Sequence, residues 1–558
     1  MARSVRLRRW QKNALERFDA SPAADFLAVA TPGAGKTTFA LTAARQELAR
    51  HPHRRVVVVV PTQHLKTQWA RAATAFDLHL EPDWAASDGR LPPDMHGVIV
   101  TYQQVAGSAP ALRGLAAEAF VIFDEIHHAG EERAWGDSVR LAFEPAGRRL
   151  SLSGTPFRSD TQSIPFVAYA DDEARPDFEY GYDSALEDGG VVRPVYFPRI
   201  DGDMEWMAPD GGLHGATFAD ALDRVRSGQR LRTALSLEGE WLPAVLDQAH
   251  EQLMAVRGVD PGAAGLVIAM DQDHARGVAA MMTRRFGVRP TVALSDDPGA
   301  SAAIARFAAG SDPWIVAVRM VSEGVDIPRL RVGVFATNTT TELFFRQAVG
   351  RLLRWTRGHR RQQAFMFIPD DPRLRTLSAQ IAEQRRHSLR RRADRRDDDL
   401  IDPRPEVSAA FDEIPGQADA QLSLFAAISA VALGDPHRPE PAMGLAGDEP
   451  DVDLSEADDD SLVIELAPAP VLGTMATGAG TGAGAAGATT TLTRREHKQA
   501  LRDANADRVR VLARITGWSH AQVNGELNRL SGVRRVTEAT VEQLASRLAH
   551  AGKWLDRL

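Results

Sequence analysis

Short apolar runs alternate with amphipathic segments along the first 195 residues of the chain. The runs cover residues 26–30, 56–60, 97–100, 120–123 and 150–153, and segments with apolar residues at helical spacing lie between most of them. Strands that alternate with helices predict a parallel sheet with crossover helices. Because ligands bind such sheets at the carboxyl ends of the strands, we expect the functional residues of this α/β unit to follow the apolar runs.

The same alternation returns in the second half of the chain. Strand-type runs cover residues 265–270, 314–318, 332–336 and 363–368, and a helix is expected to open at Asp273, just after the first of them. These runs predict a second α/β unit. The stretch between about residues 200 and 260 is expected to be mostly helical, and the pattern assigns it to no part of the sheet.

The composition is that of a globular protein and narrows the chemistry. Of the 558 residues, 44% are apolar and 25% are charged, and the net charge of −8 means that any basic surface must be local. The chain has no Cys, which excludes disulfides, Cys-ligated zinc and a thiol nucleophile and fits a reducing cytoplasm. The N-terminus lacks the apolar core of a signal peptide, and the longest aliphatic run, 56–60, is too short to cross a membrane. We therefore expect a cytoplasmic protein with no membrane partner.

A Gly-rich segment follows the first apolar run and opens a helix. Its residues are Thr31, Pro32, Gly33, Ala34, Gly35, Lys36, Thr37 and Thr38. A strand, a Gly-rich loop and a helix in this order form a phosphate cradle, in which the loop N–H groups and the helix N-terminus face the phosphate oxygens. Lys36 would reach the β- and γ-phosphates of a nucleotide, and the Thr37 hydroxyl would bind Mg²⁺. Ala30 stands where this pattern usually has its first Gly, and the alternative is a Gly-rich turn with a chance Lys.

An acidic pair, Asp124 and Glu125, follows the apolar run 120–123. Asp124 could hold Mg²⁺ opposite Thr37, and Glu125 could orient and activate an attacking water. Alternatively, the two acids only begin the next helix as N-terminal charges. His127 and His128 come next, but no third ligand stands nearby, so we interpret one His as a link between the nucleotide site and its surroundings.

Together with further segments in the same order, these motifs resemble the superfamily 2 helicases and translocases of the DExH type. The resemblance covers about residues 7–370, and its segments are 7–11, 30–38, 61–69, 101–103, 124–127, 153–158, 321–328 and 347–354. Each short motif is weak alone, but the order and spacing are specific. The Phe157-Arg158 ending of the sixth segment and His127 resemble the DNA-acting branch, which includes restriction-subunit and excision-repair helicases.

The resemblance implies a fold and a split site for ATP and Mg²⁺. The fold is α/β, with two RecA-like parallel-sheet domains in tandem at 1–195 and 196–375. In the first domain, Arg8 and Gln11 would contact the adenine, and His127, Ser153 and Thr155 would couple the nucleotide to the rest of the motor.

The second domain would complete the site. Gly324 permits a tight turn near the nucleotide, and Asp326 could accept a ribose hydroxyl bond. On a helix, Gln347, Arg351 and Arg354 share one face, and the two Arg would act as arginine fingers on the γ-phosphate. The alternative is two Arg on a solvated helix face.

The same resemblance implies a nucleic-acid partner, with DNA favoured over RNA. Short hydroxyl and amide side chains suit contacts with the sugar-phosphate backbone that ignore base sequence. The candidates after the strands are Pro61, Thr62, Gln63, Thr101, Tyr102, Gln103 and Thr339. We expect a helicase or translocase. The alternatives are a motor or switch subunit of a larger complex that does not unwind strands, or an RNA helicase.

The tail beyond residue 375 carries weaker signals. Residues 376–491 begin with a predicted basic helix that either contacts phosphates or pairs with Asp397–Asp399. A disordered acidic segment is expected from 448 to 465, followed by a flexible linker rich in Gly, Ala and Thr. Residues 492–558 predict a small basic all-α domain, with Ser519 and Thr537 as helix N-caps. This domain binds DNA or a partner, or it is a mildly basic folded tail.

A five-residue segment from Gln421 to Phe425 resembles the peptide by which bacterial replication and repair proteins dock on the sliding clamp. The alternative is a buried helix face formed by Leu422, Phe425 and Ile428. The oligomeric state is left open by these patterns.

Overall fold

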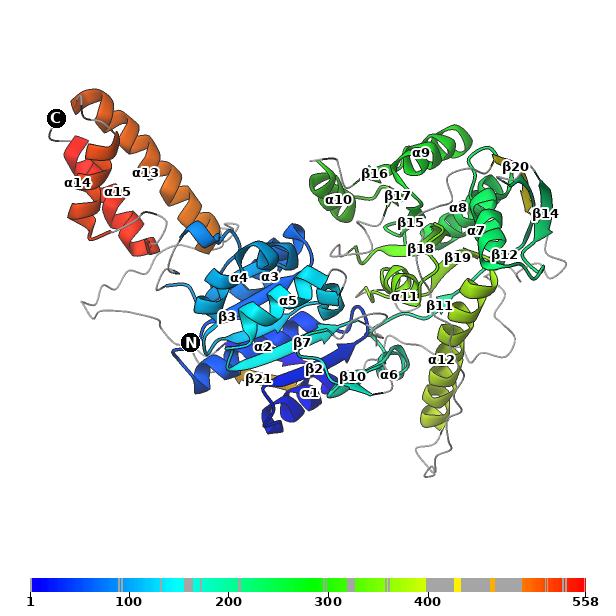
Figure 1. Ribbon diagram of the computed structural model, residues 1–558, viewed down its shortest axis with the longest axis horizontal. Coiled ribbons are helices and arrows are strands. Elements are labelled where there is room, and N and C mark those ends of the chain that lie inside the picture. Colours follow the sequence, from blue (N-terminus) through cyan, green and yellow to red (C-terminus); the bar gives the residue numbers. More distant parts are fainter. Residues whose placement is uncertain are drawn as a thin grey trace.

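A computed structural model of the chain describes most of the residues. They are 3–88, 91, 94–130, 133–154, 164–170, 173–208, 212–294, 297, 299–318, 327–356, 359, 362–397, 426–432, 462–466, 494–516, 518, 520–533, 536, 539–555 and 557. Two α/β domains stand side by side, and a helical bundle lies against the first of them (Figure 1).

The first domain is built on a seven-stranded parallel sheet with strand order β10-β2-β7-β6-β3-β5-β4. The strands are β2 (Asp25–Ala30), β3 (Val56–Val60), β4 (Leu80–Glu81), β5 (Gly97–Thr101), β6 (Phe120–Phe123), β7 (Arg148–Ser153) and β10 (Phe178–Tyr180). The helices that connect them are α1 (Arg9–Ala20), α2 (Lys36–Arg50), α3 (Gln63–Ala75), α4 (Tyr102–Ala116) and α5 (Arg133–Phe143). The predicted strands are thus present at nearly the predicted positions.

Helices cover both faces of this sheet, which explains its unbroken apolar strands. Along β3, Val56 and Val58 belong to the core under α1, α2 and α3, whereas Val57 and Val59 belong to the core under α4 and α5. A strand buried on both faces needs apolar residues at every position, not at alternate ones.

The second domain repeats the plan. Its parallel sheet has the order β11-β19-β18-β15-β17-β16, and β12 also pairs with β19. The strands are β11 (Val195–Tyr196), β12 (Arg199–Ile200), β15 (Ala264–Ala269), β16 (Thr291–Ala293), β17 (Trp314–Ala317), β18 (Leu330–Ala336) and β19 (Ala364–Pro369). The helices are α8 (Trp241–Val259), α9 (Gln272–Phe286), α10 (Ala300–Ala309), α11 (Glu342–Gly350) and α12 (Pro372–Asp397). The prediction of two RecA-like domains in tandem is confirmed.

The expectation of a mostly helical stretch between 200 and 260 is wrong for its first part. Strands β13 (Gly202–Met207) and β14 (Leu213–Thr217) form a hairpin there, and α7 (Arg224–Ala234) and α8 follow. Along β13, Met204 and Trp206 are buried, whereas Asp203, Glu205 and Met207 are exposed. This alternation is the pattern expected of a strand that is buried on one face, but it extends over only six residues of the sequence.

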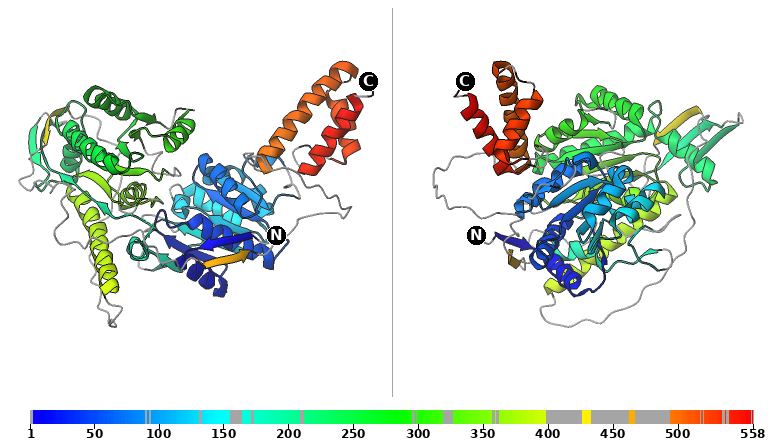
Figure 2. Two further views of the ribbon diagram at one scale, coloured as in Figure 1. Left: turned by 180° about the vertical axis from the view of Figure 1, so that it is seen from behind. Right: turned by 60° about the vertical axis from the view of Figure 1, so that its left-hand side comes forward.

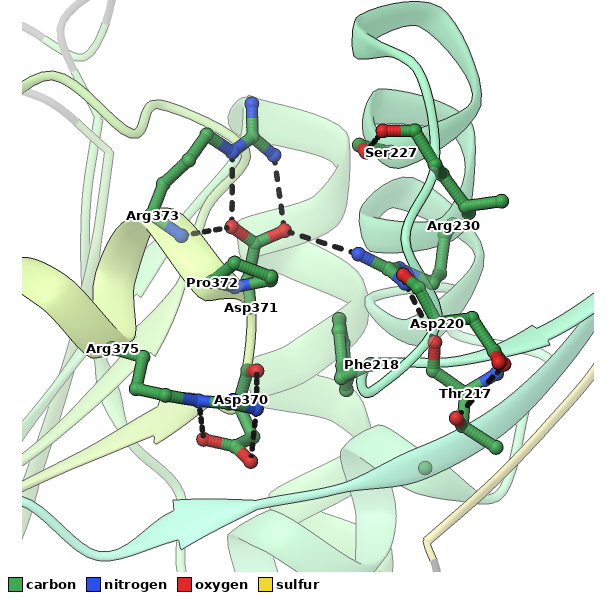
Figure 3. Close-up of polar contacts among 12 residues, drawn as sticks. Thr217, Phe218, Asp220, Ser227, Arg230, Asp370, Asp371, Pro372, Arg373 and Arg375 are labelled. Carbon is green, nitrogen blue, oxygen red and sulfur yellow. Dashed lines mark hydrogen bonds and ion pairs between the residues drawn. The ribbon is translucent and has the colours of Figure 1, made fainter.

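A buried polar cluster joins the hairpin to the start of α12 (Figure 3). Arg230 of α7 donates hydrogen bonds to the carbonyls of Thr217 and Asp220, and its guanidinium lies 4.0 Å from the buried carboxylate of Asp371. Arg373 donates to both oxygens of the same carboxylate, at 2.9 and 3.1 Å. The cluster fixes the hairpin on the second domain.

Two strands lie in the tail that was expected to be linker. β20 (Ala426–Ala432) pairs with β13, and β21 (Leu462–Leu466) pairs with β1 (Arg3–Leu7) at the N-terminus. The expectation of disorder from 448 to 465 is therefore wrong for residues 462–465, which lie in β21 and pair with β1. A helix through Ile428 is also wrong, since this residue lies within β20, while the segment 421–425 falls outside the described residues.

Within the basic segment of α12, Arg385 and Arg391 both have partners in the protein. The Arg385 guanidinium is buried, stacks over the Tyr196 ring at 4.0 Å and donates to the Val195 carbonyl. Arg391 lies 2.9 Å from Glu187. Both contacts fall near the junction of the two domains.

The C-terminal part folds as the expected small helical domain. Helices α13 (Arg494–Thr516), α14 (His520–Ser531) and α15 (Val541–Leu555) pack together beside the first domain (Figure 2). Thr540 caps α15, since its hydroxyl accepts from the Gln543 N–H; the predicted caps Ser519 and Thr537 lie outside the described residues. Within the described part of the chain, no helix combines the length and apolar character needed to cross a membrane.

Candidate nucleotide site

The loop between β2 and α2 has the backbone of a phosphate cradle. Gly33 and Gly35 have φ angles of +87° and +96°, a region that favours glycine. A Cβ on Gly35 would lie 2.8 Å from Nε2 of Gln11, so the end of this flexible side chain would have to move. Lys36 begins α2, and Thr37 and Thr38 follow in its first turn.

The N-terminal motif holds this loop from its carbonyl side. Arg8 donates to the carbonyls of Gly33 and Ala34, at 3.1 and 2.7 Å, and Gln11 donates to that of Gly35 at 2.9 Å. Trp10, which the sequence did not single out, donates to the Ala34 carbonyl at 3.1 Å. In this conformation Arg8 and Gln11, expected at an adenine, therefore position the phosphate loop.

The acidic pair lies at the carboxyl end of β6, directly opposite Lys36. Glu125 Oε1 is 2.7 Å from Lys36 Nζ, and its other oxygen accepts a hydrogen bond from the Gly154 N–H at 2.9 Å. Glu125 has a φ of +48°, a left-handed conformation that is uncommon outside glycine and that clusters at functional sites. Three loops thus converge on one carboxylate.

Asp124 is buried and held by two aromatic side chains. Trp69 Nε1 donates to Asp124 Oδ2 at 2.8 Å, and the Tyr102 hydroxyl donates to the Asp124 carbonyl at 3.0 Å. Burial, followed by the charge of Glu125, raises the pKa of Asp124 to about 6. Burial alone would also raise the pKa of Glu125, but Lys36, His127 and the hydrogen bonds from Lys36 and Gly154 outweigh it and lower that pKa to about 2.

The second domain reaches this site through α11. His127 lies 3.4 Å from Ser153 Oγ through Nδ1 and 3.1 Å from the Gln347 amide through Nε2. A Cβ on Gly350 would lie 2.6 Å from Pro32 Cγ, so a glycine is needed where α11 meets the phosphate loop. The two halves of the expected site are therefore in contact.

The predicted arginine fingers follow α11, which ends at Gly350 and has Arg351 as its C-cap residue. The expectation that Gln347, Arg351 and Arg354 share one helix face is therefore wrong for Arg354, which lies beyond the helix in a bridge with Val192. The side chain of Arg354 passes next to Gly33, since a Cβ on that glycine would lie 3.6 Å from Arg354 Cδ. Thr155, Gly324 and Asp326 lie outside the described residues.

A buried arginine in the connection between the domains was missed by the sequence analysis. Arg193 donates to the carbonyls of Leu330 and Pro328 and to the Thr356 hydroxyl, at 2.8, 2.9 and 3.0 Å. Its own N–H donates to the Leu353 carbonyl. Burial, and then Arg331, lower the pKa of Arg193 well below its usual value. Arg193 thereby ties the connection to the segments on both sides of α11.

The candidate nucleic-acid residues follow three strands but differ in exposure. Gln63 and Gln103 are exposed, while Pro61, Thr62 and Thr339 are half-buried. Thr101 is buried, and its hydroxyl accepts from the Gln104 N–H as the N-cap of α4. The Tyr102 side chain is fully buried, so the expected direct contact of Tyr102 with a strand is wrong in this conformation.

The chain is similar in sequence to known proteins. Residues 4–158 match the sequence model of the family described as "Type III restriction enzyme, res subunit". An uncharacterized protein of Mycobacterium tuberculosis (strain H37Rv) is 49% identical over 393 residues, and one of Mycobacterium leprae (strain TN) is 47% identical over 391. Each match covers 69% of this chain and 65% of the relative, so the chain aligns with less than two thirds of these proteins' length.

Solved structures with a similar fold are distant in sequence. A fragment of a putative HsdR subunit of a type I restriction enzyme from Vibrio vulnificus has 16% identity and a TM-score of 0.46, over 66% of this chain and 65% of that one. The ATP-dependent type ISP restriction-modification enzyme LlaBIII, bound to DNA, has 15% identity and a TM-score of 0.45, over 69% of this chain and 29% of that one. Dbp5 of S. cerevisiae, bound to RNA and ADP BeF3, has 13% identity and a TM-score of 0.43, over 67% of this chain and 87% of that one.

Proposed function

We propose that this chain is a member of the helicase-like superfamily 2 and an ATP hydrolase that nucleic acid stimulates and that moves along a strand or separates strands. One observation carries the proposal. The phosphate loop, with Lys36 paired to Glu125, is in direct contact with α11 of the second domain. A split site of this kind couples nucleotide hydrolysis to movement between domains.

The donor set fits ATP and a magnesium ion. Lys36 and the loop from Thr31 to Gly35 would hold the phosphates, and Thr37 with Asp124 would hold the metal. The buried Asp124 carboxylate accepts a hydrogen bond from Trp69 Nε1. Burial and the neighbouring Glu125 charge disfavour its ionised form and raise its pKa, and a bound divalent cation would stabilise that ionised form. When bound, Mg²⁺ neutralises charge on the phosphate oxygens.

The chain's own residues would supply the remaining steps. Lys36 exchanges Glu125 for phosphate oxygens, which leaves the Glu125 carboxylate to orient a water and accept its proton. Arg351 and Arg354 stabilise the charge that develops on the γ-phosphoryl group. His127 and Gln347 report the state of the site from one domain to the other.

The nucleic acid is proposed to be DNA, and the protein is proposed to act in the cytoplasm in repair, recombination or defence against foreign DNA. The DNA preference is supported by the match of residues 4–158 to a restriction-enzyme family. That family describes a subunit, which also supports a second candidate function, namely a motor within a larger complex that does not unwind strands itself. We further propose that Gln421–Phe425 docks on a sliding clamp.

Two assays on the purified full chain test these proposals. ATP turnover is measured with single-stranded DNA, double-stranded DNA and RNA at several salt concentrations. We expect stimulation by DNA that falls with salt, because contacts with the backbone release counterions. Stimulation by RNA alone would overturn the choice of DNA, and strand displacement by the single protein separates a helicase from a motor subunit.

A further inference from the structure

Helices α3 and α4 both begin at loops proposed to contact nucleic acid, and both reach Asp124. They lie on opposite faces of the first sheet, since Trp69 of α3 belongs to one core and Tyr102 of α4 belongs to the other. Both start at the carboxyl edge of the sheet, where β3 and β5 end. Asp124 follows β6, the strand next to β3 in the same sheet.

The link through α3 runs along the helix axis. Thr62 is the N-cap residue, Gln63 is exposed, and Trp69 lies seven residues beyond the cap, a rise of about 10 Å. The indole is 2% exposed and donates to the carboxylate oxygen Asp124 Oδ2. A ring packed this closely cannot reorient alone, so a shift of α3 moves the donor relative to the carboxylate.

The link through α4 is shorter. Thr101 caps this helix, Gln103 in its first turn is exposed, and Tyr102 between them points inward and is fully buried. The Tyr102 hydroxyl donates to the main-chain carbonyl of Asp124. The two helices therefore hold different parts of one residue, its side chain and its backbone.

A polar brace joins the first turns of the two helices. The ammonium of Lys66, on α3, donates to Gln104 Oε1 at 3.0 Å, and the Gln104 N–H donates to the Thr101 hydroxyl at 3.1 Å. Lys66 is only 5% exposed. The brace therefore joins the starts of the two helices that hold Asp124.

We propose that Trp69 and Tyr102 are positioning residues that transmit strand binding at loops 61–63 and 101–103 to Asp124, and so to metal-bound ATP. This inference rests on the proposed function. It gives Tyr102 a role that its burial permits, in place of direct contact with a strand. If the two side chains only filled the hydrophobic core, the indole N–H and the hydroxyl would still need hydrogen-bond partners, but these partners need not be on Asp124, the proposed metal ligand.

Coupling between ligands provides the test, because it is measured by binding and not by turnover. If an oligonucleotide tightens a non-hydrolysable ATP analogue with Mg²⁺ by some factor, the analogue tightens the oligonucleotide by the same factor. We expect a factor of about 5–150 in the wild-type chain. In Trp69→Phe and Tyr102→Phe, which delete one donor each, we expect it to fall to within about twofold of unity, with oligonucleotide affinity alone nearly unchanged.

Matched controls delete similar groups away from Asp124. Trp241→Phe removes a buried indole donor in the second domain, and Tyr169→Phe removes a hydroxyl elsewhere in the first domain. Both should keep the wild-type factor. Full coupling in Trp69→Phe and Tyr102→Phe would overturn the inference, whereas no ATP or oligonucleotide binding by the wild-type chain would overturn the proposed function instead.

A third variant keeps the inference testable if a Phe variant fails to fold. Gln104→Ala breaks the brace between α3 and α4 without touching Asp124. Its coupling factor should be reduced but not lost. A coupling factor that Gln104→Ala leaves unchanged would then contradict the proposed transmission to Asp124.

Discussion

The ammonium of Lys36 lies 2.7 Å from Oε1 of Glu125, so the group expected to hold phosphates and the group expected to activate water neutralise each other. This pairing is the main reason that the pKa of Glu125 is low, about 2, despite burial. A carboxylate of such low basicity is a poor proton acceptor. If Lys36 binds phosphates as proposed, its separation from Glu125 would raise the basicity of this carboxylate, and the base would be available only when a nucleotide is bound.

The first prediction concerns Glu125→Gln. Gln fills the same space but accepts no proton, so kcat should fall at least about 100-fold, the usual contribution of a general base. Nucleotide affinity should be kept or increased, because Lys36 loses its competing partner. Single-turnover hydrolysis and fluorescent-nucleotide binding measure the two effects. In the companion variant Lys36→Ala, nucleotide binding should weaken. Near-normal turnover in Glu125→Gln would show that Glu125 is not the base that activates water.

The second prediction concerns the pH dependence of stability through Asp124. Its pKa in the folded protein, about 6, is above the value of about 3.9 for an unfolded chain. The folded state therefore binds the proton more tightly between these values, and its stability falls as the pH rises from about 4 to 6. Asp124→Asn removes this cost, so it should raise the melting temperature above pH 6 and have little effect near pH 4.

Thermal melts of the nucleotide-free protein at several pH values measure the effect. The exposed Asp203 provides the matched control, since Asp203→Asn should shift the melting temperature little at any pH. Asp124→Asn should also lose Mg²⁺-dependent turnover. A melting temperature that Asp124→Asn lowers at pH 8 would contradict the burial argument.

The longer strands of both sheets could be predicted from the sequence because they are buried on both faces, whereas the short strands β4, β10, β11, β12 and β16 were not predicted. Runs such as 56–60 and 332–336 have no polar residue to hide their identity. The hairpin β13–β14 was missed because its alternating pattern spans only a few residues next to two genuine helices. Strands β1 and β21 could not be found, since each is stabilised by a partner more than 450 residues away.

The site divides in the same way. Lys36, Asp124 and Glu125 were found because phosphate and metal chemistry needs these residue types at the ends of neighbouring strands. Nothing local marks Trp69 or Arg193, whose partners come from other segments. A Trp or Arg within an apolar stretch signals only that its polar end needs some partner when buried, not which one.

The third prediction concerns the arginines at the end of α11. Arg351→Ala and Arg354→Ala should each lower turnover about 10³-fold or more, as expected for arginine fingers, while nucleotide binding by the first domain is largely kept. Arg346→Ala is the control, because Arg346 lies on the same helix and pairs with Glu342 rather than facing the phosphate loop. Turnover by Arg351→Ala and Arg354→Ala equal to that of the control would remove the assignment of both residues as arginine fingers.

The fourth prediction concerns the docking of the C-terminal helices on the first domain. Lys498 lies 3.0 Å from Asp94, both side chains are nearly fully buried, and the Val541 N–H at the start of α15 donates to the same carboxylate. Removing one partner of a buried ion pair leaves the other charge uncompensated. Asp94→Ala should therefore release the helices, which limited proteolysis between residues 466 and 494 would detect as faster cleavage.

Basal ATP turnover should survive this release, and also deletion of residues 492–558, because Lys36, Glu125 and Arg351 lie upstream. Nucleic-acid affinity or partner recruitment should weaken in the deletion. Asp203→Ala, on an exposed position of β13, is the proteolysis control. If the deletion abolished basal turnover, the helical domain would have to be part of the motor.

The last prediction concerns the segment Gln421–Phe425 and a bacterial sliding clamp. A tethered peptide of this kind binds in extended form, with the Leu and Phe side chains in an apolar pocket and the Gln making polar contacts. The strand β20 begins at Ala426, directly after the segment, and so excludes the helix through Ile428 that was the competing explanation.

A peptide spanning 416–430 should bind the clamp of the host organism. Leu424→Ala and Phe425→Ala should each weaken binding at least about tenfold, because each removes a buried apolar side chain. Ser423→Ala, at the position where the motif tolerates small residues, should bind normally. In the full chain, the residues that follow the segment are held in β20 by pairing with β13. Binding of the clamp is therefore measured with the full chain as well as with the peptide. Absence of binding by both the peptide and the full chain would remove the clamp from the list of partners.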